Sequence, residues 1–337
     1  MLKVAIVGAG TMATVRARAL LATGLVELCG VASHRAESAN QFANNFNIAY
    51  ATTDYRSLTT QKPDALLVEL PHKIQDEVVL WALQEDLHIL LGGCLSTNSK
   101  IGEEIIALCE QQQVIIECGY EARYKPCWHY VKEQLGRGVI GSPSIINAIA
   151  LWNAPPNSWY YNQAASGGMP ITHMTYAFIN PLRWLFGEPL QVAAMSNQVK
   201  EADCHHVHEE SCIVNIRFPN QLLVSLTASY ITAPEKTHWH LEIFGTDGML
   251  EIHPGDLGTG LIQHYSKENG IITSDFSDAE NAFNKQAKIF IDQINNGNIG
   301  DSQRKNMLLN SPKMVINDIR IAEAIVHSAK NNEVVYF

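Results

Sequence analysis

Apolar residues in the first 120 positions occur in short continuous runs, and between these runs they recur at helical spacing. The runs predict buried strands, and they lie within residues 3–10, 26–33, 64–70, 88–93 and 114–120. The segments with helical spacing predict helices at residues 11–23, 35–46, 76–86 and 100–113. Strands that alternate with such helices predict βαβ units, whose right-handed crossovers give a doubly wound parallel sheet.

The pattern changes after Tyr120. Pro126 opens a predicted helix that ends in the glycine-rich segment GRGVIGSP, and apolar and polar residues then alternate over 212–218 and again over 222–227. Two further strands flank the turn Gly245-Thr246-Asp247-Gly248, which is a hairpin signal. We therefore predict an α/β protein whose second part is a mostly antiparallel sheet with one face much more polar than the other. Two more helices are expected at 283–297 and 316–331.

Composition excludes several classes of protein. The net charge is −10 and there is no block of Lys and Arg, which argues against a nucleic-acid partner because such binding needs clustered cations. No apolar run reaches the roughly 18 residues of a membrane helix, and the N-terminus reads as a strand and a turn rather than a cleavable signal. The seven cysteines are odd in number and contain no C-x-x-C pair, so we expect a reduced, cytoplasmic protein.

A glycine turn follows the first predicted strand. Residues 8–13 read Gly-Ala-Gly-Thr-Met-Ala, which is G-x-G-x-x-A between a strand and a helix. Gly8 permits the tight turn, Gly10 lets the backbone approach a pyrophosphate, and Ala13 keeps the helix close to the strand. Thr11 and Met12 lie in the first helical turn, whose N–H groups and dipole attract phosphate. The motif in this βαβ context predicts a dinucleotide site.

The end of the second strand bears on which dinucleotide binds. Folds that prefer NAD usually place an acidic residue there for the ribose 2′-hydroxyl, whereas this chain has Ser33, His34 and Arg35. A hydroxyl and a guanidinium suit a 2′-phosphate, so the sequence favours NADP over NAD. The alternative is a solvent-facing helix start in which Ser33 serves only as the N-cap.

The chain resembles the family of glucose–fructose oxidoreductase, inositol dehydrogenase and MocA over nearly its whole length. The segments that carry the resemblance are VAIVGAGTMA, VASHRAESANQFANNF, TTDYRSL, the Pro71 loop, GYEARYKP, GRGVIGSP, SGGMP, RWLFGEP and EIFGTDGMLEI. The resemblance implies an NAD(P)-binding Rossmann domain at 1–120 and an α/β substrate and oligomerisation domain at 121–337, built on a large, mostly antiparallel open sheet. It also implies a homodimer or homotetramer and a small sugar-like or cyclitol-like substrate, oxidised or reduced with NAD(P).

The departures from the family concern the groups that handle protons. The family's Glu-Lys-Pro aligns with Gly92, Gly93 and Cys94, so the lysine becomes Gly93. The family's Asp-x-x-x-His helix aligns with His173 and Ala177, so the catalytic histidine becomes alanine. The next family position in that helix is Asn180, and the last position of the loop after Pro71 is Gln75.

Two residues are the candidates to replace the missing acid and base. His173 could exchange a proton near neutral pH, although a buried histidine bonded to backbone is an equal alternative. Lys73 could reach the space of the absent lysine, although a solvated lysine is the commoner case. The cofactor set is completed by Pro71 and His72, which follow the third strand at the sheet edge where ligands bind.

The predicted substrate side comprises Gly93, Cys94, Tyr120, Arg123 and Asn180. Arg123 matches a common family arginine near the substrate, and its alternative role, like that of the tyrosines beside it, is packing or a surface ion pair. Cys94 lacks an identifiable neighbouring cation or base, so an inert thiol is favoured over a nucleophile. Tyr160 and Tyr161 could edge the pocket. No metal is predicted, because Cys204, His205, His206 and His208 lack a second ligand cluster and read as a surface loop.

Three functions remain open from the sequence. The leading hypothesis is an NADP-dependent oxidoreductase with a rearranged acid/base set, acting on a carbonyl, hydroxyl or imine. The second is a non-redox enzyme that uses bound NAD(P) transiently, for which the chain offers no clear eliminating base. The third is a catalytically degenerate, nucleotide-binding sensor or regulatory protein, which the loss of both lysine and histidine would fit.

Overall fold

The structure is a computed structural model of the whole chain, and it describes residues 1–155, 158–166, 168, 175–198, 207, 210–230, 238–254, 260–266, 270–295 and 308–337. The chain forms two compact units. The first contains Met1–Tyr120 together with Phe283–Ile316, and the second contains Glu121–Ala282 and Asn317–Phe337. The sequence analysis assigned Phe283–Ile316 to the second domain, whereas these residues pack with the first 120.

The first unit is built on a parallel sheet of six strands in the order β3-β2-β1-β4-β5-β6. The predicted doubly wound sheet is thereby confirmed, and its order is that of dinucleotide-binding folds. The strands are β1 Leu2–Val7, β2 Val26–Ala32, β3 Ala51–Thr52, β4 Ala65–Val68, β5 His88–Leu91 and β6 Ile116–Glu117.

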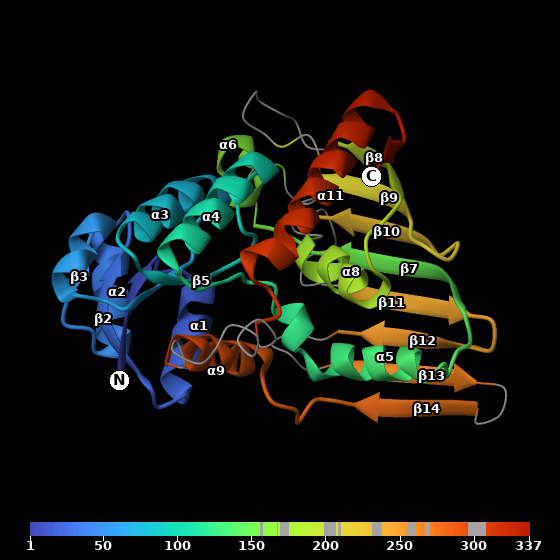
Figure 1. Cartoon of the computed structure of the whole chain (residues 1–337), viewed down its shortest axis with the longest axis horizontal. Coiled ribbons are helices and arrows are strands. Elements are labelled where there is room, and N and C mark those ends of the chain that lie inside the picture. Colours follow the sequence, from blue (N-terminus) through green and yellow to red (C-terminus); the bar gives the residue numbers. More distant parts are fainter. Residues whose placement is uncertain are drawn as a thin grey trace. The chain divides into compact units, whose positions relative to one another are not determined.

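Helices cover both faces of this sheet (Figure 1). One face carries α1, α2 and α9, whose apolar residues share a core with β1 and β2. On the other side α3 packs on β4 and β5 and against α4. The bounds are α1 Thr11–Ala22, α2 Ala36–Phe46, the 3₁₀ helix η1 Tyr55–Gln61, α3 His72–Gln84, α4 Ser99–Gln112 and α9 Ala282–Asn295. Helix α3 begins four residues before the predicted start at residue 76, because Pro71 supplies the N-cap.

The second unit is built on a nine-stranded sheet in the order β14-β13-β12-β11-β7-β10-β9-β8-β15. Only the β7–β10 pair is parallel among the described strands, so the predicted mostly antiparallel sheet is confirmed. The strands are β7 Pro143–Leu151, β8 Gln191–Asn197, β9 Ser211–Arg217, β10 Leu223–Ser229, β11 His238–Gly245, β12 Gly248–His253, β13 Leu261–Ser266, β14 Gly270–Asp275 and β15 Val335–Tyr336.

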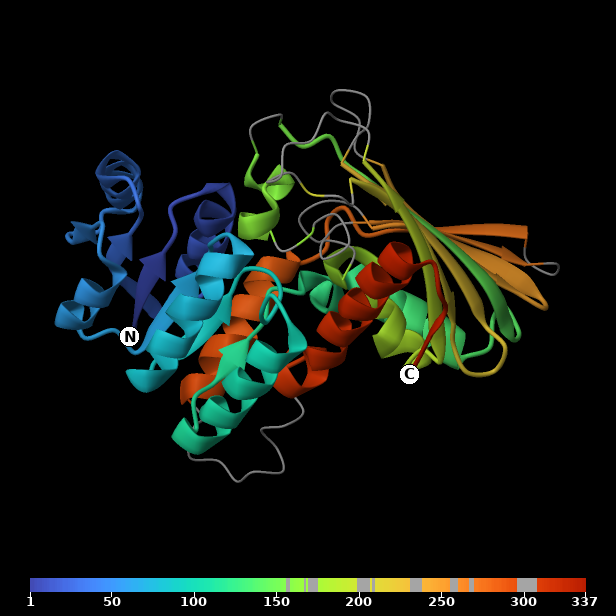
Figure 2. The same ribbon diagram turned by 90° about the horizontal axis from the view of Figure 1, so that it is seen from above.

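Helices lie on one face of this sheet, and the other face carries none among the described elements (Figure 2). The strand residues alternate accordingly, with Val214, Ile216 and Leu226 buried beneath the helices and Ile213 and Asn215 on the open face. The bounds are η2 Glu121–Tyr124, α5 Pro126–Gly136, η3 Trp159–Tyr161, α6 Gln163–Ser166, the π-helical turn η4 Thr175–Ile179, α8 Asn180–Phe186 and α11 Pro312–Asn331.

The predicted hairpin at Gly245–Gly248 joins β11 to β12, with Leu241 opposite Ile252. The π-helical turn η4 leads directly into α8, where Pro181 stands in the first turn. Proline cannot donate to the carbonyl of Ala177, so the regular helical pattern cannot run through this point. Among the described helices, none is long and apolar enough to cross a membrane.

Candidate functional site

The turn between β1 and α1 requires glycine at its first position. Gly8 has a φ of +107°, and a Cβ placed on it would lie 2.0 Å from the carbonyl oxygen of Glu69. Its N–H donates to the carbonyl of Ala32 at 2.9 Å. The turn is therefore held against the ends of two neighbouring strands, and no L side chain fits there.

The second glycine of the turn faces open space. A Cβ on Gly10 would meet no atom within 4 Å, and Gly10 is the N-cap of α1 without a capping side chain. Ala13 is buried against the strand, whereas Thr11 and Met12 are exposed. The first N–H groups of a helix have no intrahelical acceptor. The end of α1 thus offers donors, a positive dipole end and room, which are the features that a pyrophosphate requires.

The loop after β2 presents Ser33, His34 and Arg35. Ser33 is half-buried, and its backbone N–H donates to the carbonyl of Thr52 at 3.1 Å. His34 and Arg35 are exposed, and neither side chain is hydrogen-bonded or ion-paired to another described residue. The N-cap of α2 is Arg35 rather than Ser33, and its side chain does not cap the helix. The guanidinium is therefore available to an anionic group.

The loop after β4 leads through Pro71 into α3. His72 is buried and Lys73 is exposed in the first turn of the helix. Gln75, in the position where the family loop ends in histidine, is fully buried and donates from Nε2 to the carbonyl of Cys94 at 2.6 Å. This hydrogen bond ties α3 to the segment after β5, which includes Gly92 and Gly93.

The Glu69 side chain fills the space that a side chain at position 92 would need. A Cβ on Gly92 would lie 2.0 Å from the Glu69 carboxylate, so the Glu69 side chain fills the place where a residue at 92 would project. Gly92 has no positive φ, so the backbone itself would accept a side chain. The carboxylate that fills this space comes from Glu69, directly after β4.

Gly93 differs from Gly92 in its backbone. Its φ is +98°, in the region that L residues rarely adopt, and its carbonyl accepts the N–H of Gly119 at 2.9 Å. A lysine at this position would be strained by about 1–3 kcal/mol. The backbone conformation at position 93 therefore favours glycine over lysine.

A buried polar network lies beneath the glycine turn. Arg16 of α1 pairs through Nε with Glu69 Oε1 at 2.7 Å, and its side chain is 3% exposed. It also donates to Gln286 Oε1 at 2.5 Å and to the carbonyl of Gly119 at 3.2 Å. Gln286 and Asn310 both donate to Glu117 Oε1, at 3.0 and 3.2 Å. Gln286 and Asn310, both from the segment Phe283–Ile316, thereby supply an acceptor to Arg16 and two donors to Glu117.

The sequence reasoning did not single out this network. Arg16 shares a helical face with Ala13, Ala17 and Leu20, all of which are buried, and a charge on such a face needs a buried partner. Glu69 directly follows a fully buried strand. These two positions were the signal that could have predicted the pair, whereas Gln286 and Asn310 are too distant in sequence to be assigned.

A second buried charged group lies in α3. Asp76 is 6% exposed, and its Oδ2 accepts the Thr97 hydroxyl at 2.5 Å. Burial raises the pKa of Asp76 to about 6, although the hydrogen bonds from Thr97 act in the opposite direction. The carboxyl links the start of α3 to the loop that precedes α4.

The predicted substrate residues of the second unit lie in a buried network. Asn180 is fully buried and donates from Nδ2 to Asp318 at 2.7 Å. Arg183 donates to the other oxygen of Asp318 at 2.7 Å and to Glu188 at 2.9 Å. Arg123 is buried and donates to the carbonyl of Asn180 at 3.0 Å. These contacts fasten α8 to α11 and give Asn180 and Arg123 partners within the fold.

The remaining predicted residues differ in burial, and some lie outside the described residues. Tyr120 is fully buried, and its carbonyl accepts Asn310 Nδ2 at 2.7 Å. Cys94 is buried and forms no disulfide. Ala177, in the position of the family histidine, is half-buried in η4. The predicted proton donor His173 and the segment from Cys204 to His206, with His208, lie outside the described residues.

Aromatic rings gather at one end of the second unit. Tyr160 stacks on Tyr230 at 5.4 Å between ring centroids, and Trp152 meets both rings edge-on at 5.0 and 5.6 Å. Tyr161 is buried and donates its hydroxyl to the carbonyl of Ala154 at 3.3 Å, so it packs within the fold. Trp152, Trp159 and Tyr160 are half-buried and pack against the buried residues Ala154, Tyr161 and Tyr230.

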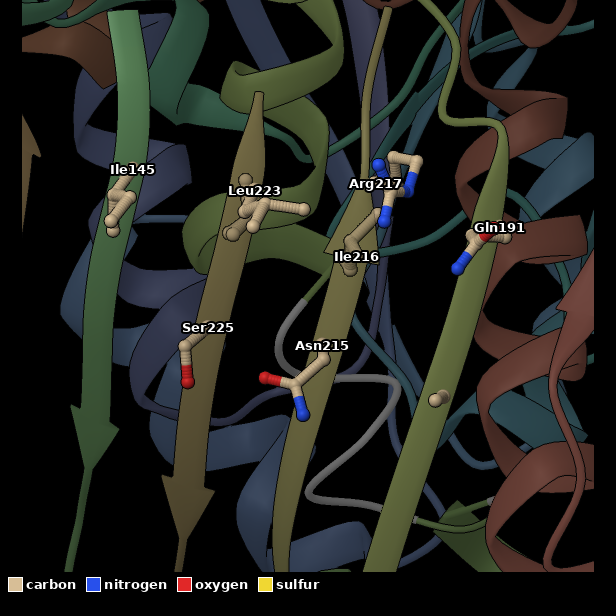
Figure 3. Close-up of a pocket in the computed structure, with 9 residues that line it drawn as sticks. Ile145, Gln191, Asn215, Ile216, Arg217, Leu223 and Ser225 are labelled. Atoms are coloured by element: carbon tan, nitrogen blue, oxygen red, sulfur yellow. The ribbon is translucent and has the colours of Figure 1, made fainter. Parts of the chain in front are cut away.

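The open face of the large sheet carries a shallow hollow of about 350 Å³ over β7, β10, β9 and β8. Figure 3 shows Ile145 and Leu223 on neighbouring strands, with Asn215, Arg217 and Gln191 further across. Four large apolar residues on this face are strongly exposed, namely Ile145 at 47%, Leu223 at 44%, Ile213 at 51% and Met195 at 71%. Such a group of exposed apolar side chains on one face is typical of an interaction surface.

Both units match models of known protein families. Residues 2–120 match the family model described as "Oxidoreductase family, NAD-binding Rossmann fold", and residues 128–251 match the "GFO/IDH/MocA C-terminal domain". An inositol 2-dehydrogenase/D-chiro-inositol 3-dehydrogenase of Lacticaseibacillus casei is 26% identical over 303 residues, which cover 87% of this chain and 84% of that protein.

Solved structures share the whole fold at low identity. An aldose-aldose oxidoreductase from Caulobacter crescentus, complexed with glycerol, has a TM-score of 0.86 at 18% identity and covers 100% of this chain and 99% of its own. A levoglucosan dehydrogenase in complex with NADH and levoglucosan has a TM-score of 0.85 at 19% identity, with 99% of each chain covered. At these identities the likeness shows the fold alone.

Proposed function

The chain belongs to the GFO/IDH/MocA family of oxidoreductases, and on this premise we propose that it oxidises or reduces a small sugar-like or cyclitol-like substrate with a nicotinamide dinucleotide. The observation that carries the proposal is the glycine turn, where Gly10 leaves open space at an uncapped helix N-terminus. Residues 8–13 would hold the pyrophosphate, and a bound nicotinamide ring would supply the hydride chemistry. The first unit, Met1–Tyr120 with Phe283–Ile316, would hold the nucleotide, and the second, Glu121–Ala282 with Asn317–Phe337, would hold the substrate and mediate self-association.

We propose NADP as the preferred dinucleotide. Arg35 is exposed and has no ion-pair partner among the described residues, and no carboxylate in the 33–35 loop would repel a 2′-phosphate. Arg35→Ala should weaken NADPH binding about tenfold or more and leave NADH binding nearly unchanged, since charge-assisted contacts to phosphate contribute about 1.5–3 kcal/mol. Fluorescence titration with both nucleotides tests this preference, and equal loss for NADH and NADPH would refute it.

The proton transfer must use groups other than a lysine at position 93. A substrate hydroxyl that loses hydride from its carbon must also lose its proton, and glycine at position 93 has no side chain that could take it. We propose that His173, assisted by Lys73 or a water, exchanges this proton: it donates the proton when the substrate is reduced and accepts it when the substrate is oxidised. Lys73 is exposed in the first turn of α3, next to the predicted cofactor residues Pro71 and His72. His173→Ala should lower kcat while NADPH affinity stays unchanged.

The aromatic rings of the second unit support a sugar-like substrate. The C–H faces of sugars and cyclitols are apolar and pack well on aromatic rings, and Trp152, Trp159 and Tyr160 present such rings. Related proteins carry names that concern inositol, aldoses and levoglucosan. A panel of cyclitols, aldoses, their keto forms and cyclic imines, with NADP⁺ or NADPH, is the direct test. Turnover with any member supports the proposal.

A nucleotide-binding sensor is the second candidate, and a specific observation favours it. The chain carries alanine at 177 and glycine at 93, where the φ of +98° disfavours a lysine, so both groups implied by the family are absent from these positions. A sensor would bind NADPH tightly and give no turnover with any member of the panel. Catalytic turnover that depends on His173 would exclude it.

We propose that the part of the open sheet face formed by β7, β8, β9 and β10 is the self-association surface of a homodimer or homotetramer. The exposed residues Ile145, Met195, Ile213 and Leu223 form an apolar surface whose burial would favour a second copy. Light scattering should give a multiple of the 37.3 kDa chain mass. Ile213→Asp should shift the protein to the monomer, and an unchanged oligomer would assign the interface elsewhere.

A further inference from the structure

Three side chains converge on one point of the open sheet face. His240 lies on β11, and Glu251 and His253 lie on β12. Glu251 Oε1 is 3.2 Å from His240 Nε2 and 3.0 Å from His253 Nε2, and one ligand atom from each of the three residues lies within 4.8 Å of the others. The side chains are 17%, 21% and 42% exposed, so the cluster is partly enclosed and open to solvent on one side.

The strand register builds this cluster. Leu241 pairs with Ile252, so His240 lies directly opposite His253, and the two rings stack with centroids 4.8 Å apart. Glu251 is two residues before His253 and therefore projects from the same face of the strand. The three residues are held by the main-chain hydrogen bonds of a tight hairpin, so bringing them together requires little further ordering.

A fourth residue orients the carboxylate. Tyr265 on β13 donates its hydroxyl to Glu251 Oε2 at 3.0 Å, which leaves Oε1 directed at the two histidines. A carboxylate with one oxygen held by an outer hydrogen bond is the usual arrangement around protein-bound metals, where such outer partners fix ligand orientation. Both histidines present the same atom, Nε2, to that oxygen.

We propose that His240, Glu251 and His253 bind a transition-metal ion, Zn²⁺ in particular, with a water as the fourth ligand. Tetrahedral zinc with bonds of about 2.0–2.1 Å keeps neighbouring ligand atoms roughly 3.3 Å apart, which is close to the two separations seen here. Two imidazoles and one carboxylate select zinc over magnesium or calcium, which prefer oxygen ligands. The site lies on the sheet of the second unit and is separate from the glycine turn, so the binding does not rest on the proposed redox function.

The sequence analysis predicted no metal because it considered only ligands close together in the chain. His240 and His253 are joined by the hairpin at Gly245–Gly248, and the signal was present in the paired segments HWHLEIF and MLEIH. Counting residues outward from the turn would have placed the two histidines opposite one another.

Zinc titration of the chelator-treated full chain tests the site. Isothermal calorimetry should detect binding of Zn²⁺ to the wild type and no comparable binding of Mg²⁺. Glu251→Gln and His253→Gln should each weaken this zinc binding by about 100-fold or more, since even outer-shell changes reduce metal affinity 10–100-fold. Replacement by Co²⁺ should give the visible absorption of a four-coordinate ion, and both variants should lose it.

Two matched controls identify the site. His238→Gln removes a histidine on the same strand, 5.9 Å from the ring of His240 and outside the group of three, and should leave the binding intact. A triple variant, Cys204→Ser with His205→Gln and His206→Gln, removes the other histidine-rich segment and should also leave it intact. The side chains of Glu251 and His253 are partly exposed, so circular dichroism should show folded variants. No zinc binding, or binding that only the triple variant abolishes, would overturn the assignment.

Discussion

The exchange of side-chain space between Gly92 and Glu69 predicts a compensating pair of substitutions. Glu69→Ala leaves the Arg16 guanidinium, which is 3% exposed, without its carboxylate. Removing one partner of a buried ion pair costs about 3–5 kcal/mol. Two acceptors of Arg16 remain, namely Gln286 Oε1 and the carbonyl of Gly119, so we expect a loss near 3 kcal/mol. For a unit of this size that corresponds to about 6–12 °C in Tm.

Gly92→Glu alone should be at least as damaging. Its Cβ would lie 2.0 Å from the Glu69 carboxylate, so Glu69 must leave its place and the pair with Arg16 is lost. In the double variant Glu69→Ala, Gly92→Glu, the new carboxylate enters the space that Glu69 vacates and can face Arg16 from β5. We expect the double variant to lose about 1–2 kcal/mol, far less than the sum of the single losses.

Urea unfolding followed by circular dichroism, together with NADPH titration, measures this coupling. Gly93→Glu is the matched control, because the φ of +98° at Gly93 strains any side chain whether or not Glu69 is present. It should therefore show no rescue by Glu69→Ala. Additive losses in the Gly92 cycle would refute the argument that the two side chains share one space.

Three further predictions follow from buried or crowded groups. Gly8→Ala should lower the Tm of the first unit, because its Cβ would lie 2.0 Å from the Glu69 carbonyl oxygen. Gly10→Ala should leave the Tm unchanged and weaken NADPH binding, because a Cβ there meets only open space. The reverse outcome would contradict the roles assigned to the two glycines. The pKa of Asp76 is raised from 3.8 to about 6, so its contribution to stability is present below about pH 4 and is lost as the pH rises through 6. The free energy of unfolding of Asp76→Asn lacks this pH dependence, so it should rise by about 2–3 kcal/mol relative to that of the wild type between pH 4 and pH 7. Urea unfolding at several pH values measures this difference. A difference that does not change with pH would argue against the raised pKa of Asp76. Asn180→Ala should lower the free energy of unfolding by about 1–3 kcal/mol, because one Asp318 oxygen loses its amide donor. A change in KM without a change in stability would instead give Asn180 the substrate role that the family resemblance implies.

The architecture was largely predictable because it is recorded in short-range patterns. The continuous apolar runs marked β1, β2, β4 and β5, and the alternation of residues 212–227 marked β9 and β10 on either side of a turn. The start of α3 was misplaced because His72 and Lys73 lack apolar periodicity, although Pro71 was a usable helix-start signal.

The chemistry was less predictable because it depends on residues that meet only in the folded chain. The Glu69 carboxylate fills the space beside Gly92, and Glu69 lies 23 positions earlier, directly after another strand. The partners of Arg16 and Glu117 at Gln286 and Asn310 are more than 160 positions away. No local pattern carries such pairings, whereas the two histidines of the β11–β12 hairpin could have been paired by counting from its turn.

The discontinuity of the first unit has a consequence for biosynthesis. Residues 1–120 leave the ribosome about 160 residues before Phe283, which at usual translation rates is a delay of roughly 10–30 s. During that interval Arg16 and Glu117 lack the amides of Gln286 and Asn310, and the nascent domain carries an incompletely satisfied interior. The nucleotide-binding half therefore reaches its final form only after nearly the entire polypeptide has been made, so a chain that stops early leaves both halves unfinished.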